Sequence, residues 1–164
     1  MLFNRSRDIL IVFLLLVCLE HFILNENQFS GPLPEDIRHL KSIKEILLHF
    51  NSFSGSIPDD VFKNMSNLEI LMLYENDFVG SIPKSLGSCT KLCEVYLEYN
   101  GFLGEVPKEL GSLQSLERLS IKKNSLTGTM PDEVCGLIDG GVLSYLIADC
   151  KENETACDCC HKCF

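Results

Sequence analysis

Residues 51–58 read NSFSGSIP, and four close copies of this phrase recur in the chain: NQFSGPLP, NDFVGSIP, NGFLGEVP and NSLTGTMP. Each copy begins with an asparagine, and successive asparagines are 24, 25, 24 and 24 residues apart. A fixed period between about 20 and 50 residues is typical of a solenoid, in which each repeat stacks on the next. The phrase therefore predicts a repeat architecture for most of the 164 residues.

Apolar residues precede each asparagine at fixed distances of eleven, eight, five and three positions. Before Asn51 they are Leu40, Ile43, Ile46 and Leu48. The last two are separated by one residue, which is the pattern of a short strand with one buried face. Because such a strand returns every 24 residues in the same direction, neighbouring strands must be parallel. We expect these strands to form a concave sheet, with short helical or irregular segments on the convex side.

The phrase itself has a structural interpretation. Each asparagine ends a strand, and its amide can bond the buried backbone of the turn, so the stacked repeats should form an asparagine ladder. The third position holds a large apolar side chain that fills the bend, glycine at the fifth permits unusual backbone conformations, and proline at the eighth starts the convex segment. The expected ladder consists of Asn27, Asn51, Asn76, Asn100 and Asn124, and the expected apolar column of Phe29, Phe53, Phe78, Phe102 and Leu126.

The full pattern, L-x-x-L-x-x-L-x-L-x-x-N-x-[FL]-[SVLT]-G-x-[LIVM]-P, resembles the 24-residue plant-type leucine-rich repeat. That family includes receptor-like proteins, receptor-kinase ectodomains and polygalacturonase-inhibiting proteins. The resemblance covers about Leu16 to Pro131, and the ending GGVLSYLIADC with CDCCHKC is similar to the tails of diatom leucine-rich-repeat proteins. The resemblance implies an α/β solenoid that forms a right-handed horseshoe segment. It also implies a non-enzymatic recognition module that acts outside the cell or at its surface.

Three regions are expected. Residues 1–18 have the form of a signal peptide or signal anchor, because Arg5 and Arg7 precede an apolar run from Ile9 to Leu19. This segment overlaps the first repeat, and Ile9–Leu24 can be assigned either to a signal or to repeat core. About five repeats occupy residues 16–137, and a cap strand with a cysteine-rich tail occupies residues 138–164. We expect a secreted or cell-surface protein, with membrane contact only through an uncleaved N-terminal segment.

Six of the nine cysteines lie in the last thirty residues. An open solenoid end exposes apolar core, and disulfides would stabilise a short capping tail. The alternative is a zinc or copper(I) site on the thiols and His161. Adjacent thiols suit a tetrahedral site poorly, and a secreted chain oxidises them, so we expect disulfides, no metal and no cofactor. The cysteines are Cys135, Cys150, Cys157, Cys159, Cys160 and Cys163.

Other function classes find little support. The formal net charge of −9 argues against nucleic-acid binding, because the only basic cluster is Arg118, Lys122 and Lys123. None of the four histidines falls beside a nucleophile and an orienting carboxylate, so no catalytic residues are predicted. Asn64 and Asn153 head glycosylation sequons, which suit a secreted chain.

The residues that do not repeat point outward from the predicted concave strands. Many are apolar or aromatic, and an exposed apolar patch usually marks a contact site. We expect it to bind a protein, peptide or glycan. An alternative is a structural or adhesive wall or matrix component that binds its own copies; the oligomeric state is open. The expected binding residues are Leu47, His49, Phe50, Met72, Tyr74, Tyr96, Glu98, Tyr99 and Lys122.

Overall fold

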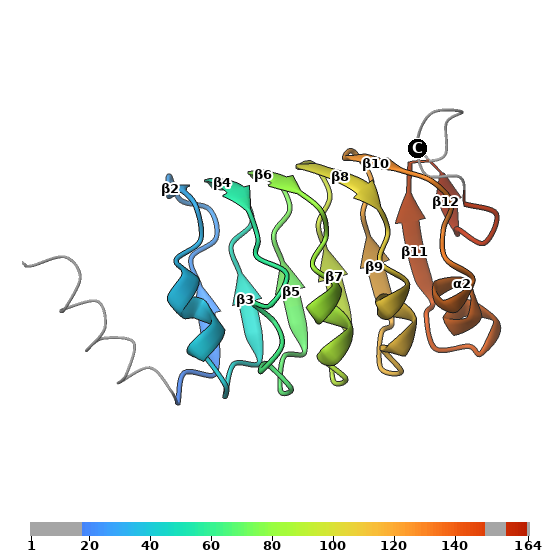
Figure 1. The fold of residues 1–164 in the computed structure, drawn as a ribbon, viewed down its shortest axis with the longest axis horizontal. Helices are drawn as coiled ribbons and strands as arrows, with labels where there is room; N and C mark the ends of the chain where they lie inside the picture. The colour runs from blue at the N-terminus through green and yellow to red at the C-terminus, as the bar shows by residue number, and fades with distance from the viewer. Residues whose placement is uncertain (1–17, 150–156, 164) are drawn as a thin grey trace, which may run out of the picture.

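The computed structural model describes residues 18–149 and 157–163, and within them the repeats stack side by side in chain order (Figure 1). One strand from each repeat joins a seven-stranded sheet in which every neighbouring pair is parallel. The predicted solenoid of parallel strands is therefore confirmed. In sheet order the strands are β1 (His21–Ile23), β3 (Glu45–Leu47), β5 (Ile70–Met72), β7 (Glu94–Tyr96), β9 (Arg118–Ser120), β11 (Tyr145–Ala148) and β12 (Lys162–Cys163).

The recurring phrase forms a second parallel sheet of five strands, where the sequence predicted only a bend. Each phrase extends along its copy in the next repeat, so its backbone groups are paired between repeats. The glycine at the fifth position has a φ between 79° and 88° in all five phrases, a region that other residues rarely adopt. The strands are β2 (Ser30–Gly31), β4 (Ser52–Ser56), β6 (Asp77–Gly80), β8 (Gly101–Glu105) and β10 (Ser125–Thr127).

The convex side carries short helices, as the sequence predicted, and each follows the proline of a phrase. The carbonyl of Pro83 accepts a hydrogen bond of 3.1 Å from the N–H of Leu86, and every repeat has the equivalent bond. In the second repeat residues 59–64 form turns instead, and the additional residue of that repeat is accommodated there. The helices are η1 (Glu35–His39), η2 (Lys84–Ser88), η3 (Lys108–Ser112) and the α-helix α2 (Asp132–Asp139).

The core lies between the two sheets and the helices. The phenylalanines of the phrase form a continuous stack that is exposed at Phe29 and buried from Phe53 onward. Successive ring centroids from Phe29 through Phe53 and Phe78 to Phe102 are 6.0, 6.2 and 6.2 Å apart, with nearly parallel planes. Phe78 and Phe102 have no exposed surface, and Leu126 ends the column. Large rings therefore fill the space that the bend leaves, which is why one apolar position recurs in the phrase.

The asparagines of the phrase bond backbone groups on two repeats at once. The Asn76 amide donates to the carbonyls of Leu48 at 2.9 Å and Leu73 at 3.1 Å, while its oxygen accepts from the N–H of Phe53 at 2.9 Å. Asn51, Asn100 and Asn124 repeat this arrangement. Asn27, in the first repeat, is exposed, and within the described residues its side-chain amide bonds only carbonyls of its own turn. A short polar side chain is thus required wherever one strand end must be joined to the next.

The C-terminal end is closed by two strands and two disulfides. β11 continues the sheet with Leu146 and Ala148 buried, as the spacing of Leu143, Leu146 and Ala148 predicted. The tail adds β12, which the sequence did not predict, parallel to β11. Disulfides join Cys135 to Cys159 and Cys157 to Cys160, so the first of them ties the tail to α2. Disulfide bonding of Cys150, which lies outside the described residues, and of Cys163 remains a prediction without assigned partners.

The N-terminal end of the described chain belongs to the first repeat. β1 pairs with β3, and the side chains of Leu19, Phe22 and Leu24 pack against the core. The predicted signal segment lies outside the described residues except for Cys18, and so does Asn153. Among residues 18–149 and 157–163 we find no helix with the length and apolar character needed to cross a bilayer.

Candidate binding face

The candidate site lies on the seven-stranded sheet, on residues that the repeats do not share. Each repeat contributes side chains two and four positions before its asparagine, plus the residue directly before it. Phe50 and Tyr99 are 47% and 43% exposed, whereas His49 is buried. The remaining members are half-buried. We call this set the concave patch: Leu47, His49, Phe50, Met72, Tyr74, Tyr96, Glu98, Tyr99 and Lys122.

Four aromatic side chains of the concave patch form a connected cluster. His49 stacks on Tyr74 with ring centroids 4.5 Å apart, and Phe50 meets Tyr74 edge to face at 5.2 Å. Tyr74 also meets the ring of Tyr96 edge to face, at 6.4 Å. The rings come from three successive repeats, so the solenoid brings together side chains 47 residues apart from His49 to Tyr96. An aromatic cluster that is half-buried before any ligand arrives is well suited to anchor a partner.

The residue directly before each asparagine adopts a left-handed backbone conformation. The φ values of these five residues lie between 53° and 56°, although none is glycine or asparagine. The N–H of Phe50 donates to the carbonyl of Tyr74 at 3.2 Å, and Glu75 and Tyr99 make equivalent bonds to the next repeat. This turn directs the five side chains to one rim of the sheet. No sequence pattern predicts this conformation, because the residue types differ from repeat to repeat: Glu26, Phe50, Glu75, Tyr99 and Lys123.

His49 was predicted to lie on a free surface, but it is only 8% exposed. The rings of Phe50, in the same repeat, and Tyr74, in the next repeat, cover it. The repeat period cannot predict this contact, because these three aromatic residues do not recur together elsewhere in the repeats. Burial lowers the pKa of His49, with Glu26 opposing the shift. The imidazole is therefore neutral at physiological pH, and its Nδ1 atom has no hydrogen-bond partner within the described residues.

Replacement of His49 by Phe should flatten the pH dependence of stability. The unfolded histidine takes up a proton near pH 6.5, whereas the folded one does so only at lower pH, so the wild type loses stability as pH falls through this window. Phe keeps the stack on Tyr74 but cannot titrate. We expect the wild type to lose more of its urea midpoint than His49→Phe between about pH 7 and about pH 5. Parallel losses in the two proteins would contradict this account of His49.

Charge is distributed unevenly along the face. The first repeats contribute carboxylates, whereas β9 and its turn contribute Arg118, Lys122 and Lys123. Arg118 pairs with Glu94 across the strands at 3.2 Å, as its register predicted, and Lys122 lies 5.6 Å from the ring centre of Tyr99. Burial raises the pKa of Glu98, with the Ser120 hydroxyl and Lys122 opposing the shift. The face thus runs from acidic to basic along the solenoid.

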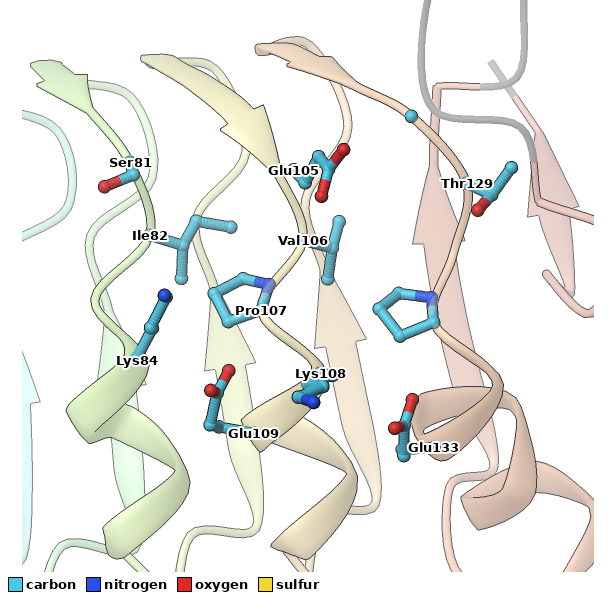
Figure 2. Close-up of a pocket in the computed structure, with 12 residues that line it drawn as sticks. Ser81, Ile82, Lys84, Glu105, Val106, Pro107, Lys108, Glu109, Thr129 and Glu133 are labelled. Atoms are coloured by element: carbon cyan, nitrogen blue, oxygen red, sulfur yellow. The ribbon is translucent and has the colours of Figure 1, made fainter.

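A second concavity of about 670 Å³ lies on the flank, between the ends of the phrase strands and the helices. Figure 2 shows side chains of three successive repeats lining it: Lys84 from the first, Glu109 from the second and Glu133 from the third. No aromatic side chain lines this groove, and its two lysines are mixed with three glutamates. It therefore offers neither an aromatic anchor nor a single sign of charge.

The structure brings no metal-binding set of side chains together among residues 18–149 and 157–163. No three histidine, cysteine or acidic side chains converge there. Three of the five tail groups considered as metal ligands, Cys157, Cys159 and Cys160, are in disulfides. Cys89 is a buried thiol whose pKa is raised to about 12 by burial, and Cys93 is also free. Neither thiol has the depressed pKa of a nucleophile.

Comparisons with known proteins give a consistent picture. Two family models, both described as leucine rich repeat, match the chain, one at residues 44–102 and the other at residues 18–40 and 115–137. Together they cover more than half of the chain. No curated protein sequence matches it.

Solved structures match most of the chain. The ectodomain of the Arabidopsis thaliana receptor kinase GASSHO1/SCHENGEN3, in complex with CASPARIAN STRIP INTEGRITY FACTOR 2, is 32% identical with a TM-score of 0.74, covering 86% of this chain and 16% of that one. The Arabidopsis HAESA ectodomain, in complex with an IDA peptide hormone ligand, is 30% identical with a TM-score of 0.75. The match covers 84% of this chain and 22% of that one. Pollen Receptor Kinase 3 is 31% identical with a TM-score of 0.69, covering 89% and 64%. This chain spans less than two thirds of each of them.

Proposed function

From the premise that this chain belongs to the leucine-rich repeat family, we propose that it is a non-enzymatic recognition module that binds a peptide or protein through its concave patch. The observation that carries the proposal is the cluster of His49, Phe50, Tyr74 and Tyr96 on the concave sheet. Two similar ectodomains were solved with a peptide hormone or a named factor bound, which supports a ligand of this class.

Several observations favour an extracellular setting for this function. Disulfides form and persist in oxidising compartments, and the tail carries two of them. Asn64 of the predicted sequon is exposed on the convex turn, away from the concave sheet, so a glycan there would leave the patch accessible. The proposed arrangement is a signal segment within residues 1–18, repeats over 16–137 and a cap over 138–164.

The double substitution Tyr74→Ala and Tyr96→Ala should abolish most capture of a partner. Extracellular fluid from the source tissue would be passed over the immobilised protein and over the variant, and bound proteins compared by mass spectrometry. Because hot-spot aromatics dominate interface energetics, we expect capture of the partner to fall at least about tenfold. The thermal melt followed by circular dichroism checks that the variant is folded.

Equal capture by a folded variant would contradict the proposal. Size-exclusion chromatography over a range of concentrations separates it from the adhesive alternative: a recognition module stays at one size, whereas a matrix protein that binds its own copies grows with concentration. Self-assembly that survives the tyrosine substitutions would favour the matrix role.

A further inference from the structure

Three side chains at the N-terminal end of the concave patch form an acidic rim, which we define as Glu26, Phe50 and Glu75. They occupy the same left-handed turn position in three successive repeats. Their N–H groups bond the next repeat at 3.0, 3.2 and 3.1 Å, so the three backbones are direct neighbours. The backbone of Phe50 therefore lies between the backbones of Glu26 and Glu75, each about one strand spacing of ~4.8 Å away.

Unlike Glu20 and Glu94, the two rim carboxylates have no cation partner within the described residues. Glu20 pairs with Lys44 at 2.7 Å, and Glu94 pairs with Arg118 at 3.2 Å. Within the described part of the chain, the side chains of Glu26 and Glu75 form neither an ion pair nor a hydrogen bond, and both are exposed. Two negative charges beside an exposed ring are thus left for a group from outside the chain.

The carboxylates of the acidic rim also influence the neighbouring aromatic cluster. The pKa of Tyr74 is raised first by burial and then by Glu98, Glu26 and Glu75. His49, more than nine-tenths buried against the Tyr74 ring, brings no positive charge because its pKa is lowered, and its Nδ1 lacks a partner within residues 18–149 and 157–163. Every polar group that the rim and cluster offer to a ligand is therefore neutral or negative.

The rings add a second attraction for a cation. Phe50 is 47% exposed although it meets Tyr74 edge to face, so about half of its surface is available to a ligand. A guanidinium stacks on an aromatic face and at the same time donates hydrogen bonds to carboxylates, because it is planar and carries five N–H donors. An ammonium has no planar face with which to stack.

We propose that the acidic rim is a subsite for an arginine side chain of the bound peptide or protein. This deepens the proposed function and rests on it: the arginine enters at Phe50, between Glu26 and Glu75, while the rest of the ligand follows the concave patch towards Tyr96. The basic end of the face, at Lys122 and Lys123, repels such a residue, so the charge gradient also sets the direction in which the ligand lies.

The test uses the whole protein labelled with 3-fluorotyrosine, since its four tyrosines give separate ¹⁹F NMR signals. The probe is the tripeptide acetyl-Gly-Arg-Gly-amide, and the same peptide with citrulline is an uncharged control of the same shape. We expect saturable shifts of the Tyr74 signal, with the arginine peptide binding roughly tenfold more tightly than the citrulline peptide. Tyr145, on β11, should not shift.

The double substitution Glu26→Gln and Glu75→Gln should reduce the affinity for the arginine peptide to that for citrulline. Glu105→Gln with Glu133→Gln is the matched control, because it removes the same charge from two exposed flank residues and should leave binding unchanged. Equal binding of the two peptides, no Tyr74 shift, or equal effects of the two double variants would overturn the subsite. Partner capture that depends on Tyr74 and Tyr96 would still stand in that case, so the two proposals fail separately.

Discussion

Replacement of Asn76 by Ala should lower the free energy of unfolding by about 3 to 5 kcal/mol. Asn76 is buried, and its amide joins the carbonyls of Leu48 and Leu73 to the N–H of Phe53. Alanine leaves the N–H of Phe53 without a partner, which costs about 1 to 3 kcal/mol when water cannot reach it. Each carbonyl loses one of its two donors, because Asn51 still donates to Leu48 and Asn100 to Leu73, and each such loss costs about 0.5 to 1.5 kcal/mol. Urea denaturation followed by circular dichroism measures the loss.

Asn27 provides the matched control. It has the same place in the phrase, but it is exposed, and among residues 18–149 and 157–163 its side chain bonds only two carbonyls of its own turn. Water can replace the amide there, so Asn27→Ala should cost under about 1 kcal/mol. Similar losses for Asn27→Ala and Asn76→Ala would mean that the ladder does not hold the repeats together.

Phe78→Ala is expected to cost about 3 to 5 kcal/mol as well, for a different reason. The ring is fully buried and stacks between Phe53 and Phe102 at 6.2 Å on each side. Its removal leaves a cavity in the middle of the column, and rigid β-strands on both sides prevent the neighbours from closing it. The expected result is a lower urea midpoint, and a broader transition if the two halves of the solenoid unfold separately.

Val79 is the control for Phe78, because it follows directly in β6 and points the other way. It is 45% exposed, so Val79→Ala should change the free energy of unfolding by no more than about 0.5 kcal/mol. A loss at Val79 as large as that at Phe78 would show that the apolar column is not the source of stability.

The fold could be predicted from the sequence because every repeat satisfies the same requirements. The asparagine, the apolar residue, the glycine and the proline each recur at one position, so the periodicity alone identified parallel strands, a ladder and convex helices. The extension of the phrase into a second sheet was missed, since serine and glycine at residues 54–56 have low strand propensity and the pairing depends on the neighbouring repeat.

The candidate site was less predictable, because it depends on contacts that occur once. The period predicts which positions of each repeat contribute to the concave patch, but the burial of His49 depends on Tyr74 lying beside it. Likewise, the left-handed turn that carries Phe50 and Tyr99 to the rim has no residue signature. The tail illustrates the same limit: the sequence indicated disulfides, but the pairs Cys135–Cys159 and Cys157–Cys160 depend on how the tail returns to α2 and β11.

The central claim is that repeated residues maintain the fold, whereas unrepeated concave residues bind the partner. The most direct measurement is the dissociation constant of the captured partner for two folded double variants. Tyr74→Ala with Tyr96→Ala removes apolar surface from the concave patch, and Val79→Ala with Leu103→Ala removes it from exposed residues of the second sheet. We predict that affinity falls at least about tenfold for the first and stays within about twofold for the second. Unchanged affinity for the first variant, or a larger loss for the second, would contradict the claim.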